Sequence, residues 1–347
     1  MNKKYKNLDR EKMTEIMKIE DTDKLQELYD AAYEAKEKFV DKKVYYRGII
    51  EFSNRCVKNC YYCGIRKDNE NVLRFDMSEK EILERAKWCY DNEYASLVLQ
   101  SGERQDKEYI EYVERLLRKI KEISNYELGI TISLGEQTKE TYQKWFNAGA
   151  HRYLLRIETT NEKLYNKLHP EDESHDFQKR VQCLEDLKDI GYQVGTGVMI
   201  GLPGQTEEDL VEDIIKFKEW DIDMIGMGPY VIHKETPLGK EAKNSLNEQK
   251  RRFKLGLKMV AIARLYLKDI NIAATTALQA LNPIGRELAL KAGANILMPI
   301  ITHQAYRKDY QLYEDKPCID DNADDCKNCL SGRVGTVGDK IMYGEWG

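Results

Sequence analysis

The sequence has no apolar run that approaches the roughly 20 residues needed to cross a bilayer, and no apolar core follows the charges of its first six residues. These absences predict a cytoplasmic chain with no signal peptide and no membrane partner. A Pro/Gly/Ser-rich linker and a low-complexity tract are also missing. The formal net charge is -5, so we expect no positive field of the kind that attracts nucleic acid.

Three of the eight cysteines stand together in the run Cys56-Val57-Lys58-Asn59-Cys60-Tyr61-Tyr62-Cys63. Cytosolic cysteines serve more often as metal ligands, reactive groups or buried apolar residues than as disulfides. The spacing C-x3-C-x2-C follows a strand-like run, and three thiolates on one loop can hold three irons of a [4Fe–4S] cluster. The fourth iron would then be open to bind S-adenosylmethionine (SAM) and pass an electron to it.

Two other interpretations of this loop stay open on spacing alone. Zinc in a closed structural site normally takes four protein ligands, and the nearest histidine, His151, is distant in sequence. Disulfides could involve some of the thiols, but three cysteines cannot all pair with one another. Tyr62, directly before Cys63, favours the iron–sulfur interpretation, because an aromatic there resembles the C-x3-C-x-Φ-C signature of radical-SAM enzymes.

The rest of the chain alternates short apolar runs with longer helical patterns. Residues 8–40 read as two or three amphipathic helices with a cap at Asp21-Thr22-Asp23. Eight strands are predicted at 48–52, 96–100, 128–134, 152–157, 193–200, 223–230, 271–277 and 295–298. Helices are predicted between them at 79–92, 107–123, 138–148, 177–190, 207–220 and 248–266. This alternation predicts a closed (β/α)8 TIM-type barrel, with the active site at the carboxyl ends of the strands.

The predicted domains are an N-terminal helical extension at 1–45, the barrel at 46–310 and a C-terminal cysteine-bearing segment at 311–347 packed on the barrel.

Polar residues at the predicted strand ends are candidate ligand contacts. Gln100 and Ser101 end the second strand before a glycine, where a plain turn is the simpler reading, and Thr131 and Ser133 on the third are either satisfied core hydroxyls or ligand contacts. On the fourth strand, alternation puts Arg156 and Glu158 on one face. If that face points inward, these charges need each other or a charged ligand, unless they form an ion pair at the rim.

Two further runs are ambiguous on the residues alone. The glycine-rich run at 195–206 lacks the lysine of a P-loop, which excludes phosphate transfer. Thr275 and Thr276 could bind a small anion, although threonine is also common in ordinary strands.

A second group of cysteines, Cys318, Cys326 and Cys329, has the spacing C-x7-C-x2-C in an acidic segment. With one further ligand it could hold a second iron–sulfur cluster, either [2Fe–2S] or [4Fe–4S], or a zinc ion. Unliganded surface thiols are the alternative.

Taken together, these motifs resemble those of the [FeFe]-hydrogenase maturase HydE family, in the biotin synthase and methylornithine synthase-like group of radical-SAM enzymes. The resemblance covers nearly the whole chain. It is carried by Ile50-Glu51-Phe52-Ser53-Asn54 with the first cysteine loop, Val98-Leu99-Gln100-Ser101-Gly102-Glu103, Arg152-Tyr153-Leu154-Leu155-Arg156, Gly201-Leu202-Pro203-Gly204-Gln205-Thr206, Asp223-Met224 with Gly228-Pro229, and Ala274-Thr275-Thr276-Ala277. The spacing of the C-terminal cysteines is similar to an accessory cluster site of some members. One departure is Ile157, where some members carry histidine.

The resemblance implies roles for individual residues. Cys56, Cys60 and Cys63 would hold the radical-SAM cluster. SAM would have its polar parts held by Ser101, Thr131, Glu158 and Arg180, and would be surrounded by Tyr62, Met199, Met224 and Leu312. A lower cavity for the substrate or small anions would be lined by Gln100, Ser133, Arg156, Thr275 and Thr276.

The implied activity is reductive cleavage of SAM to a 5′-deoxyadenosyl radical, which acts on an Fe(II)–cysteine complex with CO and cyanide ligands during assembly of the hydrogenase diiron subcluster. Implied partners are the maturase HydG, an assembly scaffold and a reductant such as ferredoxin or flavodoxin. Three alternatives remain: a related enzyme acting on an amino acid, as in methylornithine synthase or biotin synthase, a non-catalytic iron carrier, and a zinc-binding structural module.

Overall fold

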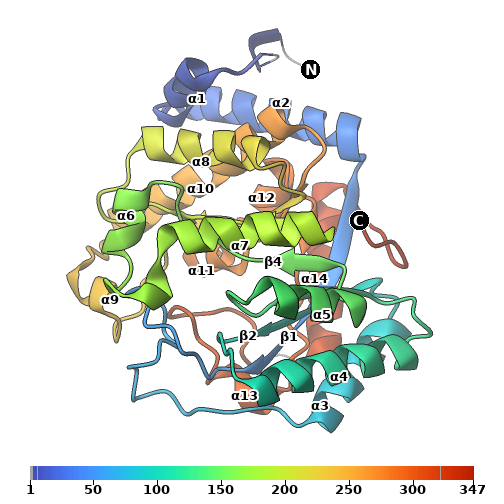
Figure 1. Cartoon of the computed structure of the whole chain (residues 1–347). Coiled ribbons are helices and arrows are strands. Elements are labelled where there is room, and N and C mark those ends of the chain that lie inside the picture. The colour runs from blue at the N-terminus through green and yellow to red at the C-terminus, as the bar shows by residue number, and fades with distance from the viewer. Residues whose placement is uncertain (1–2, 6, 321) are drawn as a thin grey trace.

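The N-terminal segment forms helices that lie along the outside of the sheet-bearing body, at the top of Figure 1. In this computed structural model, which describes residues 3–5, 7–320 and 322–347, these elements are η1 (Lys3–Tyr5), α1 (Arg10–Met17) and α2 (Thr22–Val40). The Asp21 carboxylate caps α2 by accepting a hydrogen bond from the Lys24 amide, as the sequence predicts. The apolar face of α2 packs on α10 (Leu246–Leu267), and α1 packs on α8 (Glu207–Glu219).

The central sheet is parallel throughout and runs in the order β10-β1-β2-β3-β4-β5-β7-β9. Its strands are β1 (Lys43–Ser53), β2 (Ser96–Ser101), β3 (Gly129–Ser133), β4 (Arg152–Leu154), β5 (Gln193–Thr196), β7 (Met224–Ile225), β9 (Asn271–Ile272) and β10 (Ile296–Leu297). Each of the eight predicted strands is therefore found. Several are shorter than predicted, and the fifth and sixth continue into a separate pair, β6 (Met199–Ile200) with β8 (Gly228–Pro229).

The closed barrel predicted from the sequence is not confirmed, because the eight strands curl through 272° without forming a continuous ring. The two edges meet at a single bridge between Ala273 and Ile296. The side chain of Asn295 occupies this junction: its Oδ1 accepts hydrogen bonds from the Ile272 amide (2.8 Å) and from Arg264 Nη2 (3.0 Å). Two backbone hydrogen bonds also cross the junction, from the Asn295 amide to the Ile272 carbonyl (2.9 Å) and from the Ala274 amide to the Ile296 carbonyl (2.9 Å). The side-chain amide adds to this short pairing, in which both strands are only two residues long.

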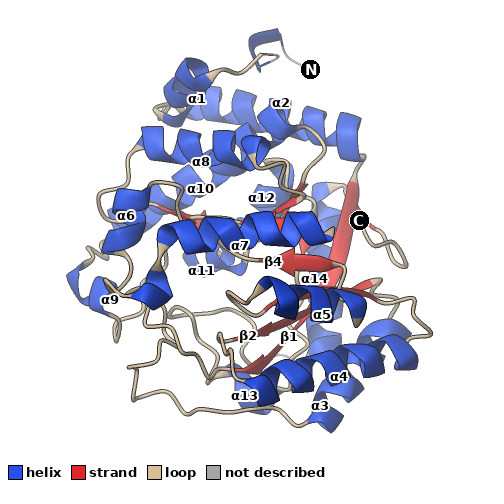
Figure 2. Ribbon diagram, viewed as in Figure 1, coloured by secondary structure: helices blue, strands red, loops and turns tan. Residues whose placement is uncertain are grey.

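Helices surround the outside of the curled sheet (Figures 1 and 2). Besides α8 and α10, these are α3 (Glu79–Asp91), α4 (Lys107–Ile123), α5 (Lys139–Asn147), α6 (Glu162–Lys167), η2 (Glu173–His175), α7 (Phe177–Ile190), α9 (Pro237–Glu241), α11 (Thr276–Leu281), α12 (Gly285–Lys291), α13 (Gln304–Arg307) and α14 (Ala323–Val337). A capping box between Ser78 and Glu81 is present at the start of α3. A second one, between Thr206 and Asp209, starts α8.

The C-terminal segment returns to the beginning of the sheet. Its strand β11 (Lys340–Ile341) pairs in parallel with β1. Lys36 on α2 and Asp339 form an ion pair (2.5 Å) with both side chains fully buried. The domain boundaries at 45 and 310 stay predictions, although these contacts tie the two ends of the chain to one body.

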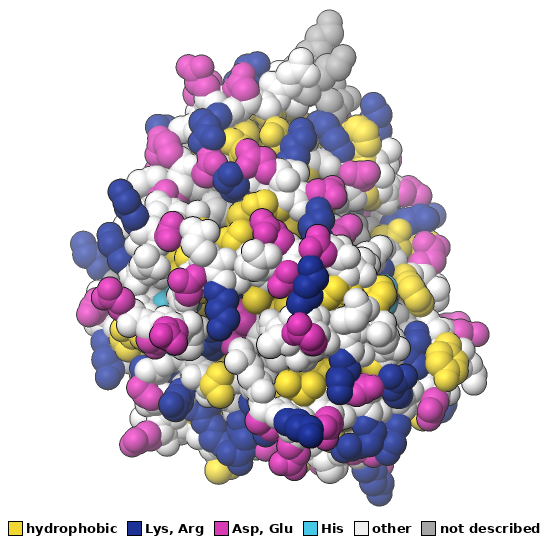
Figure 3. Space-filling view, viewed as in Figure 1, with side chains coloured by type: hydrophobic (Ala, Val, Ile, Leu, Met, Phe, Trp, Pro, Cys, Tyr) yellow, Lys and Arg dark blue, Asp and Glu magenta, His cyan; other side chains and the backbone are white. Residues whose placement is uncertain are grey.

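The face shown in Figure 3 carries Lys and Arg side chains interspersed with Asp and Glu. Among the described residues, no helix has the length and apolar character that a membrane crossing requires.

Candidate functional site

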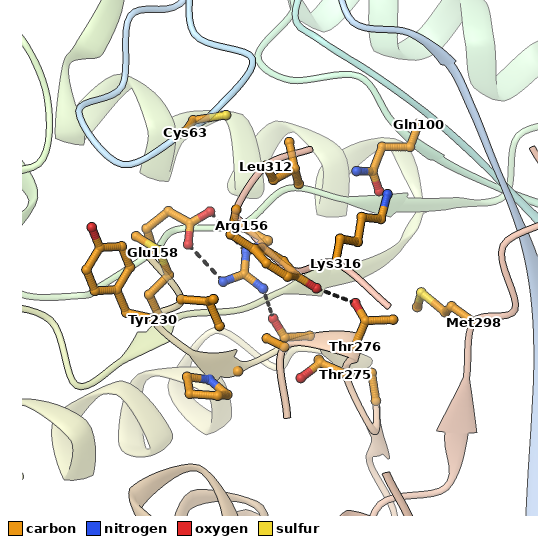
Figure 4. A pocket seen from close by; sticks show the side chains of 18 of the residues that line it. Cys63, Gln100, Arg156, Glu158, Tyr230, Thr275, Thr276, Met298, Leu312 and Lys316 are labelled. Atoms are coloured by element: carbon orange, nitrogen blue, oxygen red, sulfur yellow. Dashed lines mark hydrogen bonds and ion pairs between the residues drawn. The ribbon is translucent and has the colours of Figure 1, made fainter. Parts of the chain in front are cut away.

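A cavity of about 340 Å³ opens at the carboxyl ends of the strands, the end of a parallel barrel where ligands bind. Figure 4 shows side chains from opposite walls pointing into it. Ten of the residues predicted from the sequence line this cavity: Cys60, Tyr62, Cys63, Gln100, Arg156, Glu158, Met199, Thr275, Thr276 and Leu312. Its volume lies in the range of small-molecule sites.

The cysteine loop follows β1 and is tied to the strand ends by backbone hydrogen bonds. The Val57 amide donates to the Glu103 carbonyl (2.9 Å), and the Gly64 amide donates to the Leu312 carbonyl (2.9 Å). Gly64 has no room for a side chain, because a Cβ there would overlap the Gln311 carbonyl oxygen and the His233 ring. The sequence thus permits a tight loop that presents thiols to the cavity.

All three thiols of this loop are free of disulfides. Cys60 and Cys63 line the cavity, and Cys56 lies beside it, where its Sγ accepts a hydrogen bond from the Glu103 amide (3.3 Å). Burial raises the pKa of Cys56 and of Cys63, and it raises that of Cys60 to about 12. Within the described ranges, no three His, Cys, Asp or Glu side chains form a group that could hold a single metal ion.

A buried charge network supports the loop from behind. Lys58, in the first spacer of the motif, places its Nζ 2.8 Å from Glu136 Oε2 and 3.3 Å from Glu103 Oε1. Arg180 on α7 adds an ion pair with Glu136 (2.7 Å). Burial raises the pKa of Glu103. Two cations and two carboxylates thus balance one another directly behind the thiols.

Tyr62 is held by its neighbours rather than by the loop alone. Its ring packs against the apolar cluster that contains Met199 and Leu168. Its hydroxyl lies 3.4 Å from His169 Nε2, and burial lowers the pKa of His169 to about 3, so this imidazole is neutral. The aromatic ring is therefore fixed at the cavity wall.

Arg156 and Glu158 form a two-point ion pair inside the cavity, with both N–O distances at 2.9 Å. Arg156 also donates to the Gly226 carbonyl. The backbone of Glu158 has a left-handed φ of 67°, which is uncommon for a residue other than glycine. Figure 4 shows the pair pointing toward each other. These charges satisfy each other, one of the alternatives left open by the sequence.

The opposite wall carries hydroxyl and amide groups. Tyr313 donates to Thr276 Oγ1 (2.7 Å), and Gln100 Nε2 donates to the Tyr310 hydroxyl (3.1 Å). Thr275 Oγ1 is buried and has no hydrogen-bond partner among the described residues. A buried polar atom without a partner has capacity for a ligand.

Other predicted residues lie outside this lining. Thr131 and Met224 line a smaller cavity of about 160 Å³ near the amino ends of the strands, so their positions do not support the predicted contact with SAM. Ser101 is buried and bonds to Gly102 and Tyr109. Ser133 is half-buried and pairs with Gln100 across β3 and β2, while Arg180 stands behind the loop.

The C-terminal cysteines are only partly brought together. Hydrogen bonding to Cys318, together with burial, raises the pKa of Cys326. Cys326 and Cys329 are three residues apart on α14, which puts them on one face. Cys329 is exposed and accepts a hydrogen bond from Arg333 Nε (3.4 Å).

Sequence reasoning missed Glu51 and Lys316, which form an ion pair (2.5 Å) in the cavity wall. Glu51 is a charged residue within an apolar strand, a signal that could have been used. Lys316 lies in a segment with no periodic pattern, so nothing in the sequence identified it.

Comparison with known proteins agrees with this architecture. A family model described as the Radical SAM superfamily matches residues 50–216. The chain is 44% identical over 338 residues to the [FeFe] hydrogenase maturase subunit HydE of Thermotoga maritima, covering 97% of this chain and 93% of that protein.

Solved structures show the same fold. Methylornithine synthase superposes with a TM-score of 0.81 at 26% identity, covering 97% of this chain and 95% of that chain. The hydrogenase maturase HydG from Carboxydothermus hydrogenoformans gives a TM-score of 0.79 at 19% identity, covering 98% and 77%, and supports the fold alone.

Proposed function

Because the chain belongs to the radical-SAM enzymes and, within them, to the HydE family of [FeFe]-hydrogenase maturases, we propose that it acts on an Fe(II)–cysteine complex with CO and cyanide ligands. This reaction would be a step in assembly of the hydrogenase diiron subcluster. The observation that carries the proposal is the cavity with free thiols at its mouth and an internal Arg156–Glu158 pair.

The residues at the mouth fit a [4Fe–4S] cluster. Cys56, Cys60 and Cys63 supply three thiols on one short loop, and two of them face the cavity. Three ligands leave one iron of such a cluster open. When bound, the cluster and SAM supply a 5′-deoxyadenosyl radical.

The part of the cavity beside the cysteine loop, its upper part, fits SAM. Glu158 lines it and offers carboxylate oxygens for the SAM ammonium or ribose. Arg180 lies outside the lining and pairs with Glu136, so we assign it to support of the loop rather than to direct contact with SAM. Tyr62, Met199 and Leu312 provide apolar surface for the adenine. The Ser101 hydroxyl donates a hydrogen bond to the Gly102 carbonyl. We therefore assign Ser101 to stabilising the backbone next to this site.

The lower cavity fits a small polar substrate. Gln100, Arg156, Thr275 and Thr276 combine donors and acceptors in a wall that is otherwise largely apolar. Enclosure by protein limits the groups that the radical can reach, which matters because the radical would attack any accessible C–H bond. We assign Ser133 a supporting role in this region, because it pairs with Gln100 between β3 and β2.

The proposed partners are those that the resemblance to the HydE family implies. The substrate complex would come from HydG, the product would pass to an assembly scaffold, and a ferredoxin or flavodoxin would supply electrons. Cys318, Cys326 and Cys329 are proposed to hold a second [2Fe–2S] or [4Fe–4S] cluster with one further ligand.

The test is anaerobic. The protein is reconstituted with iron and sulfide, reduced and given SAM, and 5′-deoxyadenosine is measured with and without the iron–cysteine complex. Strong stimulation by the complex is expected. Stimulation by an amino acid such as lysine, which is an isomer of methylornithine, and none by the complex, would reassign the substrate to that of a methylornithine synthase-like enzyme.

A further inference from the structure

The ion pair between Glu51 and Lys316 lies in the wall of the main cavity. Glu51 belongs to β1, where alternation turns it inward together with Ile49, and both residues line the cavity. Lys316 comes from the C-terminal segment and points into the cavity in Figure 4. Both side chains are almost completely buried, at 4% and 6% exposed.

Both members of this pair have hydrogen-bonding capacity left. Glu51 Oε1 is 2.5 Å from Lys316 Nζ, but Glu51 Oε2 is buried and has no partner among the residues that the structure describes. Lys316 donates to Glu51 and to the Tyr310 carbonyl (3.1 Å), and its Nζ lies 5.2 Å from the centroid of the Tyr310 ring. An ammonium has three N–H donors, so one remains.

The other ion pair of the cavity, Arg156 with Glu158, makes more hydrogen bonds than the Glu51–Lys316 pair. Arg156 bonds Glu158 through two nitrogens and also reaches the Gly226 carbonyl. Burying two charges is costly unless their remaining hydrogen bonds are satisfied. The Glu51–Lys316 pair leaves an acceptor and a donor without partners, side by side in the wall of a cavity, so both have capacity to bind a ligand.

We propose that Glu51 and Lys316 form a subsite for the ammonium and carboxylate of an α-amino acid group. Glu51 Oε2 accepts from the ammonium, and the third N–H of Lys316 donates to the carboxylate. An α-amino acid carries both charges on one carbon, so both can reach two wall charges that are themselves adjacent. A zwitterion also adds no net charge to a wall whose own charges cancel.

This inference rests on the proposed function and deepens it, because it assigns the recognition of the substrate's amino acid part to these two residues.

The test is binding rather than turnover. Anaerobic calorimetry on the iron-reconstituted protein compares L-2-aminobutyrate, which has the shape of cysteine without its sulfur, with propylamine and butyrate. Wild type should bind the amino acid roughly tenfold more tightly than either single-charge probe. Glu51→Gln should weaken the amino acid and propylamine roughly tenfold, and it should not weaken butyrate, because Lys316 loses its competing carboxylate. Lys316→Met should weaken the amino acid and butyrate, and it should not weaken propylamine, because Glu51 loses its competing ammonium.

Matched controls keep the test decisive. Lys308→Met, at an exposed lysine shortly before this segment (72% exposed), should bind all three probes as wild type does. If a single variant fails to fold, Glu51→Gln/Lys316→Met removes both charges together, and it should fold but bind the amino acid no better than butyrate. No binding of the amino acid to wild type, equal loss of all three probes, or a retained preference in the double variant would overturn the proposal.

Failure of the subsite is distinguishable from failure of the proposed function. SAM cleavage stimulated by the iron–cysteine complex, with unchanged probe binding in the variants, would refute the subsite alone. The predicted binding pattern in a protein that does not cleave SAM would refute the proposed function alone.

Discussion

Replacement of Lys58 by methionine should destabilise the cysteine loop, because it leaves two buried carboxylates without their shared cation. Lys58 Nζ lies between Glu103 and Glu136, its side chain is only 4% exposed, and it also donates to the Ser174 carbonyl. Removing one partner of a buried ion pair typically costs about 3–5 kcal/mol. Methionine preserves the length and apolar stem of the lysine, so the loss reports on the charge.

The structure places this loss near the lower end of that range. Arg180 continues to neutralise Glu136 at 2.7 Å. Glu103 keeps a hydrogen bond from the Glu136 amide (2.9 Å), and burial already raises its pKa, so it can take up a proton when the lysine is absent. We therefore expect a loss of about 3 kcal/mol. The loss should be smaller at pH 6 than at pH 8, because protonation removes the uncompensated charge.

Two measurements follow this effect. Urea unfolding gives the free energy of unfolding at each pH, and iron per chain after anaerobic reconstitution and desalting reports whether the loop still holds metal. Lys67→Met is the control, since Lys67 is exposed in the same loop region and should stay within about 0.5 kcal/mol of wild type. A Lys58→Met protein with wild-type stability and wild-type iron retention would refute the reasoning.

Two further substitutions test other parts of the fold. Burial raises the pKa of Asp213 from 3.8 to about 7, so the folded state keeps a proton that the unfolded state loses, and stability should fall between these pH values by up to about 4 kcal/mol. Asp213→Asn should therefore be nearest to wild type in Tm at about pH 4 and should exceed it by a growing margin up to about pH 7, and parallel pH profiles would contradict this. At Gly197 a Cβ would overlap the Gly226 carbonyl oxygen that Arg156 binds, so Gly197→Ala should cost about 1–3 kcal/mol in urea unfolding. Gly332→Ala, where nothing lies within 4 Å, is the matched control and should cost nothing, and an equal loss in both would sink the steric explanation.

The strands and the main helices could be predicted because their signals are local. The apolar run ending at Phe52 becomes β1, and the capping residues Ser78 and Thr206 start the predicted helices. The cysteine loop was also readable, since its spacing and the preceding strand put it at the carboxyl rim. The incomplete closure of the sheet was not, because it reflects how few residues pair between β9 and β10, and the sequence does not show the length of that pairing.

For the site, the sequence predicted which strand residues face inward better than it predicted how far along the barrel each one lies. Alternation tells which strand residues face inward, but not how far along the barrel they lie. Thr131 and Met224 face inward and nevertheless line the smaller cavity near the amino ends of the strands. Lys316 reaches the main cavity only because the C-terminal segment folds back over it, which no periodic pattern reveals.

The central claim is that the Cys56, Cys60 and Cys63 loop supports reductive cleavage of SAM. The most direct measurement is anaerobic formation of 5′-deoxyadenosine by the reduced, iron-reconstituted protein, beside Cys60→Ala and, as a control, Cys89→Ala, whose buried thiol lies on α3 away from the cavity. The account predicts product from wild type and from Cys89→Ala, and none from Cys60→Ala. Equal product formation by Cys60→Ala, or no product from wild type with a fully loaded and reducible cluster, would contradict it.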